Sequence, residues 1–450
     1  MDLRDFLHAA KEQDWLIVVD RPVHPELELA AIAYALDGRP ALFENIIGHP
    51  GWRVVSGVAS DRRYFALSLG CSQQDLLFRL TEALAQPRPA PMVARASCQE
   101  VVAKPGDLYS LPLLKHLSQD AGYYVTAGVA IVRDPEGGLN ASYHRLLRVD
   151  AHHFVARLVE NRGTYNAWKK SEGDVPVAIA IGLPLHVLLA ASMSPPPGVF
   201  EMDVAQALAP TPLVRCLTND LFVPAEAEIV LEGRITHRLA EEGPFVDLTE
   251  TGDFVRMQPV IEIDAITHRR DPIYHALLPG QLEHKLLMGM PKEPDIYAAV
   301  KEVADVRQVH MTPGGASWLH AVVQIVKHHP EDGKRAIQAA YRGHGSLKHV
   351  VVVDDDINIF DPQEVEWAIA TRVQASRDVY IFPDQPASSL DPSAHHVPGQ
   401  KSRSDKAGVD ATIPWDTPNG PAHPEHFQRV RFPDVTMDLD RFIKGDRDAD

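Results

Sequence analysis

The chain has 450 residues, and its 44 Lys and Arg against 61 Asp and Glu give a formal net charge of −17 at neutral pH. This charge argues against a nucleic acid or an anionic membrane as the main partner, because both attract surfaces rich in Lys and Arg. A hydrophobic content of 45% and a charged content of 23% are typical of a folded globular chain with about two or three domains. Cys71, Cys98 and Cys216 are too few and too far apart for a disulfide framework, so we expect buried thiols in a reducing compartment.

The N-terminal segment predicts a cytoplasmic protein. Residues 1–15 carry charges throughout and lack the apolar core of a signal peptide, and no stretch of the chain has the ~20 consecutive apolar residues of a membrane span. Apolar residues recur in this segment at helical spacing, which predicts an amphipathic helix. Its expected buried face consists of Leu3, Phe6, Leu7 and Ala10.

Residues 1–110 alternate short apolar strands with helical stretches, which predicts an N-terminal α/β domain. The expected elements are strands at 15–19, 41–43 and 52–58, a helix over 72–85 and an extended Pro-rich linker over 86–91. Over residues 111–295 strand-like runs dominate, and many strands with few long helices favour a β-barrel or an open mixed sheet. The expected strands are 125–132, 175–182, 227–231 and 258–266, with a helical insert over 155–170.

Residues 296–450 return to alternating helices and strands. Helices are expected over 299–306, 334–341 and 362–371, the last with Asp361 as its N-cap and Pro362 in its first turn. The run Val350–Val353 predicts a buried strand. The whole chain is therefore expected in the α/β (α+β) class.

Polar residues alternate along the segment 140–145. If this segment is a strand, Asn140, Ser142 and His144 share one face, and Tyr143 and Arg145 share the other. A side-chain carbonyl, a hydroxyl and an imidazole on one face could hold a metal ion or a phosphate. A polar strand face at the rim of a barrel is the alternative, and the segment alone leaves both open.

Two carboxylates flank a Gly-Pro turn. Glu242 and Asp247 can be folded by this turn toward one pocket, and a carboxylic acid beside a positioned cation suits proton transfer near neutral pH. An acidic surface loop is the alternative. Glu201, just after a Pro-rich stretch, would together with Asn140 offer oxygen ligands that suit Mg²⁺ or Mn²⁺.

Several common catalytic motifs are missing from the sequence. It has no GxGxxG after a strand, no GxxxxGK[ST] and no GxSxG, and its histidines show no HxxxH or HExxH spacing. Rossmann-type dinucleotide binding, P-loop phosphoryl transfer and α/β-hydrolase chemistry therefore lack their usual support.

At the same residues the sequence resembles the UbiD family of reversible decarboxylases. The resemblance covers nearly the whole chain, with family segments in the family's order at 140–145, 157–163, 176–182, 218–233, 242–247, 352–358, 367–372 and 406–412. Any one segment alone is weak, but the whole series in register identifies the chain as similar to that family. The resemblance implies an N-terminal α/β unit over 1–110, a flavin-binding split β-barrel over 111–295 and a C-terminal α/β oligomerisation domain over 296–450.

The resemblance also implies a cofactor and partners. Such enzymes use prenylated FMN, supplied by a separate UbiX-type flavin prenyltransferase, together with a divalent metal, usually Mn²⁺, and K⁺ at its phosphate. They catalyse non-oxidative decarboxylation through a covalent adduct with that flavin, reversibly at high CO₂. A homodimer or a higher homo-oligomer is implied, with a small carboxylic acid and CO₂ as the reactants.

Site residues carry over from the family by motif. The metal ligands would be Asn140 and Glu201, and the catalytic set would be Arg145, Glu242 and Asp247. The flavin contacts would be Ser142, Tyr143, His144, Arg145, Arg157, Leu158, Val159, Arg162, Gly163, Ser192, Met193 and Lys406. Asp247 would protonate the carbon after CO₂ leaves, and Arg145 would position Glu242.

The sequence departs from the family pattern at three positions. Gly163 stands where some members have a third metal ligand, a histidine, so the coordination shell would lack it. Ala316 stands where many relatives have cysteine, and Val246 replaces a frequent glycine before the proton donor.

The segment Gln281–Lys292 resembles the branch that acts on aromatic and heteroaromatic acids, in which a histidine, here His284, faces the substrate. Lys292 and Trp318 stand where some furan-dicarboxylate enzymes have arginines, so a dicarboxylate is disfavoured, and Trp318 suits an apolar or phenolic ring. The expected substrate is an aromatic, heteroaromatic or α,β-unsaturated carboxylic acid. The alternatives are an inert UbiD-like subunit of a larger complex and a conventional FMN redox enzyme.

Overall fold

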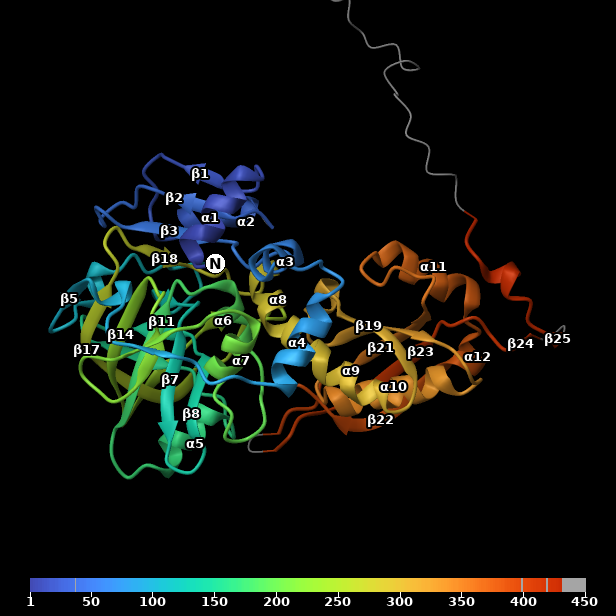
Figure 1. Cartoon of the computed structure of the whole chain (residues 1–450). Helices are drawn as coiled ribbons and strands as arrows, with labels where there is room; N and C mark the ends of the chain where they lie inside the picture. Colours follow the sequence, from blue (N-terminus) through green and yellow to red (C-terminus); the bar gives the residue numbers. More distant parts are fainter. Residues whose placement is uncertain (37, 398–399, 418–419, 431–450) are drawn as a thin grey trace, which may run out of the picture.

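The computed structural model describes residues 1–36, 38–397, 400–417 and 420–430. Figure 1 shows two lobes: the N-terminal and central parts lie together on the left, and the C-terminal part lies on the right. Helix α4 (Leu76–Ala85) lies between the lobes, and its residue Leu77 belongs to the core of the C-terminal lobe. The expected C-terminal domain runs to residue 450, but residues 431–450 lie outside the described residues.

The N-terminal part is a small sheet covered by amphipathic helices. Helix α1 (Leu3–Glu12) begins at a capping box in which Asp2 and Asp5 accept each other's backbone N–H groups, and it buries the predicted apolar face. Helices α2 (Glu28–Ala35) and α3 (Arg62–Leu69) complete this part. The strand order is β1 (Ile17–Val19), β2 (Ala41–Phe43), β3 (Arg53–Ser56) and β18 (Ile273–His275). Because β18 comes from the far end of the central segment, it joins the two parts.

The central part is a nine-stranded antiparallel sheet whose longest strands, β14 and β17, pair with each other. The strands along its main path are β6 (Tyr124–Val125), β9 (Leu146–Arg148), β10 (His153–Ala156), β17 (Arg256–His268), β14 (Ile229–Glu242), β11 (Val175–Ile181), β7 (Val129–Asp134) and β8 (Gly138–Tyr143). Strand β5 (Val101–Ala103) pairs with β17, so the chain enters this sheet before residue 110. The path runs from β6 to β8 as an open sheet, which agrees with the expected open or split arrangement.

Two sequence predictions for the central part were wrong in detail. The expected strand 125–132 divides into β6 and β7 around residues 126–128. The expected helix 155–170 begins as strand β10, and only α5 (Gly163–Lys170) is helical. The reason is tertiary: Phe154 and Val155 are fully buried and pair with both β9 and β17, so sheet pairing outweighs the local helical pattern.

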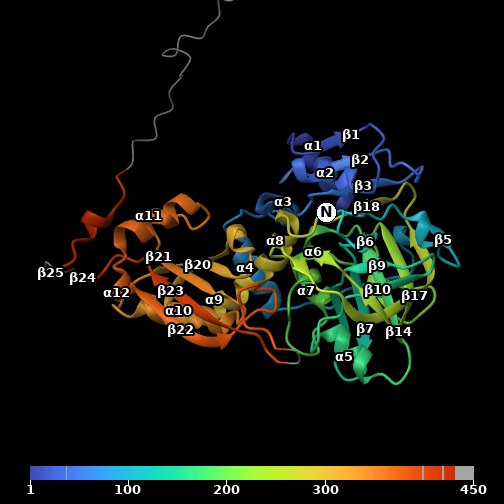
Figure 2. The ribbon, with the colours of Figure 1, turned by 180° about the vertical axis from the view of Figure 1, so that it is seen from behind.

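The C-terminal part is a mixed five-stranded sheet with helices on both faces, seen from behind in Figure 2. Its strand order is β19 (Asp305–Met311), β20 (His320–Val326), β21 (His349–Asp354), β23 (Arg403–Asp410) and β22 (Val379–Pro386). Val350 and Val352 of β21 pack in the cluster that contains α10 (Asp332–Gly343), whereas Val351 and Val353 pack with α11 (Pro362–Arg372). Burial on both faces explains the unbroken run of valines.

Helix boundaries in this part are mostly as predicted. Asp361 caps α11 by accepting the backbone N–H of Gln363 at 2.9 Å, and Pro362 occupies the first turn. The expected helix 299–306 is instead α9 (Glu293–Lys301), because the chain from Asp305 pairs with β20 as strand β19. Within the described ranges no helix is both long and apolar enough to cross a membrane.

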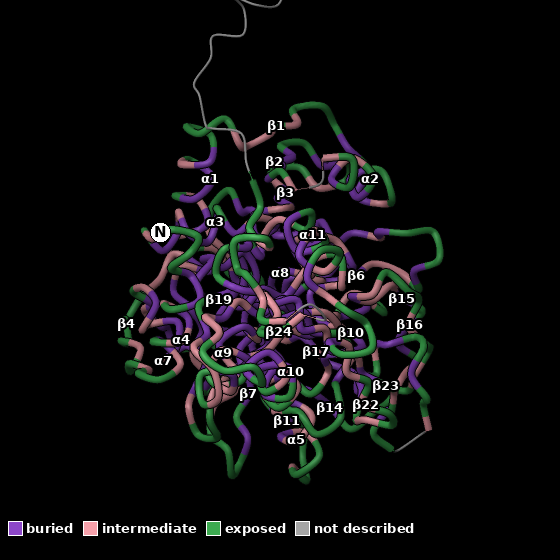
Figure 3. Tube along the Cα trace, turned by 90° about the vertical axis from the view of Figure 1, so that its right-hand side faces the viewer, coloured by how far each residue is buried: buried purple, intermediate pink, exposed green. Residues whose placement is uncertain are grey.

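Buried residues gather in the interior of the molecule and exposed residues at its periphery (Figure 3). One core cluster spans the N-terminal and central parts, and another fills the C-terminal part. Cys98 and Cys216 are buried as expected, whereas Cys71 is only half-buried because it follows the exposed C-terminal end of α3 at Gly70. A buried ion pair joins the lobes: Arg62 of α3 donates to Glu293 of α9 at 2.9 Å, and both side chains are shielded from solvent.

Candidate active site

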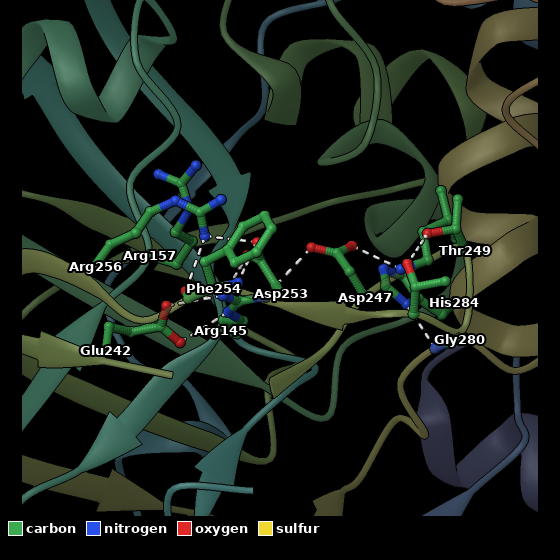
Figure 4. Close-up of polar contacts among 12 residues, drawn as sticks. Arg145, Arg157, Glu242, Asp247, Thr249, Asp253, Phe254, Arg256, Gly280 and His284 are labelled. Carbon is green, nitrogen blue, oxygen red and sulfur yellow. Dashed lines mark hydrogen bonds and ion pairs between the residues drawn. The ribbon is translucent and has the colours of Figure 1, made fainter. Parts of the chain in front are cut away.

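The site is centred on Arg145, which follows β8 and contacts three carboxylates (Figure 4). Its Nε and one Nη each donate to Glu242 at 2.8 Å, a bidentate pair. The same Nη donates to Asp253 at 2.8 Å, and the other donates to Asp247 at 3.3 Å. The structure thus brings Glu242 and Asp247 together on the guanidinium of Arg145, as predicted. The alternative, in which these carboxylates belong to an acidic surface loop, is excluded.

The ends of two hairpins position these carboxylates. Glu242 is the last residue of β14, its side chain is fully buried, and Tyr124 Oη donates to it at 3.4 Å. The chain turns at Gly243, whose φ of +90° favours glycine. After it, β15 (Phe245–Val246) and β16 (Gly252–Asp253) form a short hairpin that carries Asp247 and Asp253. Burial lowers the pKa of Arg145, but the hydrogen bond to Glu242 and the neighbouring carboxylates outweigh this and raise it.

Asp253 is a member of the site that the sequence analysis missed. It also forms an ion pair with Arg256 at 2.6 Å, so it links Arg145 to a second cation. Burial raises the pKa of Asp253, but hydrogen bonds and charges from the two arginines lower it overall. The turn between residues 246 and 252 was the signal in the sequence that could have predicted a hairpin here. In this hairpin Val246 pairs with Gly252, so Asp253 lies opposite Phe245.

His284 faces Asp247 from the other side (Figure 4). It lies on α8 (Leu282–Gly289), and its Nδ1 accepts the backbone N–H of Gly280 at 3.0 Å. Burial lowers the pKa of His284, so the ring is neutral. A neutral ring whose Nδ1 accepts a hydrogen bond carries its proton on Nε2, which makes His284 a fixed hydrogen-bond donor.

The polar face of β8 is as predicted. Asn140 Nδ2 donates to Ser142 Oγ at 3.2 Å, and Ser142 Oγ lies 3.1 Å from His144 Nε2. Thr164 of α5 closes the network at 2.9 Å from His144 Nε2, and His144 Nδ1 lies 3.0 Å from the carbonyl oxygen of Arg157. Burial lowers the pKa of His144 to about 4, so this ring is neutral and oriented.

The two predicted metal ligands lie near each other. Glu201, the first residue of α7 (Glu201–Leu208), is buried and accepts the backbone N–H of Ala141, next to Asn140, at 2.7 Å. Burial raises the pKa of Glu201 to about 7, and no cationic side chain of the described residues forms an ion pair with it. A buried carboxylate without a cation fits a metal ligand. No cluster of three His, Cys, Asp or Glu that suits a metal was found among the described residues.

Gly163 lies directly against Asn140, so a side chain at this position would clash with it. A Cβ atom on this residue would lie 2.5 Å from Cγ of Asn140 and closer still to its Oδ1. Asn140 therefore fills the space that a histidine at position 163 would need.

The residues of the central part that were also predicted to contact the flavin lie between β10 and α5 and just after α6. Leu158 is buried and donates its backbone N–H to Gln258, whereas Val159 and Arg162 are exposed. Arg157 donates to the carbonyl oxygen of Leu158 at 2.6 Å. Ser192 and Met193 follow α6 (Leu185–Ala190), with Met193 buried and Ser192 Oγ bonded to the carbonyl oxygen of Leu188. Tyr143 is largely buried, and its hydroxyl also donates to the carbonyl oxygen of Leu188.

Trp318 and Lys406 come from the C-terminal lobe. Lys406 of β23 donates to the carbonyl oxygen of Gly345 at 2.8 Å, and burial lowers its pKa to about 8. Trp318 is buried, donates to Ser388 Oγ at 3.0 Å and lies edge-on to His344 with ring centroids 4.4 Å apart. Its indole N–H is thus already used, which leaves only its ring faces for other contacts.

Comparison with known families assigns each part of the chain. Three family models match in order: the N-terminal domain of 3-octaprenyl-4-hydroxybenzoate carboxy-lyase over residues 7–84, its Rift-related domain over 92–282 and its C-terminal domain over 285–411. Anhydromevalonate phosphate decarboxylase of Methanosarcina mazei is 43% identical over 92% of this chain and 96% of its own. The enzyme of the same name from Methanothermobacter thermautotrophicus is 42% identical over 95% and 99%.

Solved structures show the same fold. The UbiD-class enzyme HmfF from Pelotomaculum thermopropionicum, in complex with FMN, superposes with a TM-score of 0.90 at 39% identity over 98% of both chains. An evolved dimeric form of HmfF holds prenylated FMN and superposes with a TM-score of 0.86 at 38% identity over 96% of this chain and 97% of its own. Apo 3,4-dihydroxybenzoic acid decarboxylase from Klebsiella pneumoniae has a TM-score of 0.88 at 28% identity over 98% of both chains.

Proposed function

The chain belongs to the UbiD family and is a carboxy-lyase, and from this we propose that it decarboxylates an aliphatic α,β-unsaturated acid that carries a phosphate ester, using prenylated FMN. The observation that supports the chemistry is the convergence of Glu242, Asp247 and Asp253 on Arg145, with the neutral His284 opposite. An inert subunit would have no use for a buried guanidinium held by three carboxylates, since such a cluster is costly to desolvate.

The residues present fit the cofactor and its ions. Glu201 offers a buried carboxylate without a cationic partner, and Asn140 offers an amide oxygen, a donor pair that suits Mn²⁺ or another divalent ion. Arg162 and Lys406 would face the flavin phosphate, while Ser192 and Met193 would lie by K⁺ and the ring. When bound, prenylated FMN supplies an electrophilic ring that takes up the electron pair released as CO₂ leaves.

The chain's own residues would control the proton. Asp247 would deliver a proton to the carbon that loses CO₂, once its carboxylate, which lies between Arg145 and His284, has taken one up. Glu242 is fully buried and holds Arg145 in a bidentate pair, so it fixes the position of the cation rather than donating the proton. His284 would donate its Nε2–H to Asp247 or to the substrate carboxylate.

The relatives' printed names guide the choice of substrate. Anhydromevalonate phosphate is an acid made unsaturated by loss of water and carrying a phosphate ester, and enzymes of that name match almost the full chain at 40–43% identity. The aromatic or heteroaromatic acid expected from Gln281–Lys292 remains the second candidate, favoured by the ring of Trp318 and by the structural likeness to 3,4-dihydroxybenzoic acid decarboxylase. We also propose that a UbiX-type prenyltransferase supplies the flavin. The chain would form a homo-oligomer, with the C-terminal part taking part in its assembly.

The test begins with co-expression of the chain and a UbiX-type prenyltransferase. The loaded protein is offered phosphorylated aliphatic enoates and aromatic acids, and CO₂ release and deuterium incorporation at the product carbon are measured. We expect turnover with the phosphorylated enoate, at a rate that Asp247→Asn suppresses at matched cofactor loading. Turnover of aromatic acids alone would refute the substrate proposal. An ordinary oxidised FMN spectrum with redox turnover would refute the decarboxylase mechanism.

A further inference from the structure

The loop that carries Asp247 rests on the helix that carries His284, and an ion pair joins the two elements. The loop consists of residues 247–251, between β15 and β16, and within it Glu250 accepts a hydrogen bond from Nζ of Lys285 on α8. The side chain of Lys285 is only 13% exposed, and Glu250 is its one carboxylate partner within the residues that the structure describes. The proposed mechanism assigns no role to either residue.

The loop is a tight turn that its own backbone closes. The N–H of Glu250 donates to the carbonyl oxygen of Asp247 at 2.9 Å, and the N–H of Asp247 donates to the carbonyl oxygen of Thr251 at 3.0 Å. Leu248 is fully buried and donates its N–H to Oδ1 of Asp247 at 2.6 Å, which fixes the direction of the carboxylate. Because Asp247 and Glu250 belong to one closed turn, a contact that holds Glu250 also holds Asp247.

The backbone of Glu250 indicates that its side chain is used. Its φ of +61° lies in the left-handed region, which residues with a Cβ atom rarely adopt. A glycine would fit this turn without steric cost, whereas a glutamate keeps the conformation only where its surroundings hold it. The contacts that hold Glu250 are its N–H bond to Asp247 and its ion pair with Lys285. The ion pair therefore stabilises a strained turn beside the proposed proton donor.

Gly280 connects this loop to His284. A Cβ atom at Gly280 would lie 3.0 Å from Cγ of Glu250 and 3.1 Å from the carbonyl oxygen of Asp247, so the loop packs directly on this residue. The same glycine donates its N–H to Nδ1 of His284 at 3.0 Å. His284 and Lys285 are adjacent on α8, and they face Asp247 and Glu250 of the one loop, respectively. The loop and the imidazole are thus held in register at two points, Gly280 and the ion pair.

We propose that Lys285 and Glu250 are positioning residues, whose ion pair holds the loop 247–251 on α8 and keeps Asp247 opposite His284 while the proton is delivered. Neither residue donates the proton. A half-exposed ion pair adds little to global stability, but reaction rates depend steeply on placement, and a displacement of ~1 Å costs up to about 10²-fold. The inference deepens the proposed function and rests on it, because it takes Asp247 as the proton donor.

The test uses variants that separate position, charge and stability. Glu250→Gln and Lys285→Met each remove one charge, and they change the local potential in opposite directions, so a rate loss in both cannot come from charge alone. Glu250→Gly removes the side chain but suits the φ of +61°, and Lys285→Arg keeps the ion pair. Glu331→Gln is the matched control, because Glu331 has the same side-chain exposure of 54% as Glu250 and pairs with Lys334 in the C-terminal lobe.

Each variant is loaded with prenylated FMN and measured in four ways. The measurements are the urea midpoint, the flavin content, deuterium uptake by the backbone of residues 247–251, and kcat and KM for a phosphorylated enoate and for aromatic acids. We expect Glu250→Gln, Glu250→Gly and Lys285→Met to lose about 10- to 100-fold in kcat, with KM, flavin content and urea midpoint unchanged. Deuterium uptake in the loop should be faster in these three variants, and Lys285→Arg should match the parent.

Each other outcome counts against the proposal or against the function on which it rests. A parent-like kcat in Glu250→Gln or Lys285→Met, unchanged deuterium uptake in the loop, or an equal loss in Glu331→Gln would overturn the positioning role. If the parent turns over neither acid, or if Asp247→Asn keeps the parent rate, the proposed function or its donor fails, while deuterium uptake still decides whether the ion pair holds the loop. If Lys285→Met does not fold, the two Glu250 variants test the same contact.

Discussion

Replacing Gly163 by Ala should damage the proposed metal site through Asn140. The added Cβ would lie 2.5 Å from Asn140 Cγ and 3.0 Å from its Nδ2. Nonbonded carbons rest about 3.5–4.0 Å apart, so Asn140 must move by roughly 1 Å. That movement breaks the bonds from Asn140 Nδ2 to Ser142 at 3.2 Å and to Thr164 at 3.4 Å.

Three contributions determine how far Gly163→Ala should lower the free energy of unfolding. Overpacking of this kind costs about 1–3 kcal/mol, and the weak side-chain bonds add a few tenths more. Alanine is the better helix former, which returns at most about 1 kcal/mol at the first position of α5. We therefore expect a net loss of ~1–2 kcal/mol in the free energy of unfolding. Affinity for Mn²⁺ should fall by ~10- to 100-fold, the usual effect of disturbing the surroundings of a metal ligand.

The assay is urea unfolding together with Mn²⁺ and flavin content after identical purification. Gly173→Ala is the matched control, because its Cβ would meet nothing within 4 Å just beyond the same helix. If Gly163→Ala matches that control in stability, metal content and flavin content, the reasoning that places Asn140 at the metal is wrong.

The remaining predictions concern the proton donor, the buried glutamate and the contact between the lobes. Asp247→Asn should keep flavin and metal but lose ~10²-fold or more in hydrogen–deuterium exchange at the product carbon, and exchange at the parent rate would exclude Asp247 as the donor. The metal-free protein should lose up to ~3 kcal/mol of stability as the pH rises from about 4.5 to 7, because burial raises the pKa of Glu201 to about 7 and the folded state then binds the extra proton. Thermal unfolding across this pH range should show that loss, Mn²⁺ should offset it at pH 8, and Glu201→Gln should show neither effect. Arg62→Met should cost about 3–5 kcal/mol in urea unfolding, because the fully buried Glu293 would lose its arginine and keep only His310 and the backbone N–H of Met311 as partners. Adding Glu293→Gln should recover much of this loss; no recovery would mean that packing of Arg62 matters more than its charge.

Features that depend on a few neighbouring residues could be predicted from the sequence. The buried face of α1, the cap at Asp361 and the buried strand at Val350–Val353 follow from side-chain periods and capping chemistry, which act over one or two turns. The shared face of Asn140, Ser142 and His144 follows from the two-residue period of a strand in the same way. The order of the family segments identified the enzyme class.

Other features were decided only by tertiary structure, because they join residues far apart in the chain. Strand β18 completes the N-terminal sheet from position 273, and β10 is a strand because two distant strands pair with it. The contact of Asp253 with Arg145 depends on a hairpin that returns it to a residue more than a hundred positions earlier, and the ion pair of Arg62 with Glu293 forms only because the two lobes pack together. Local propensity carries no information on such pairings, whose free energy comes from burial and charge in the folded chain.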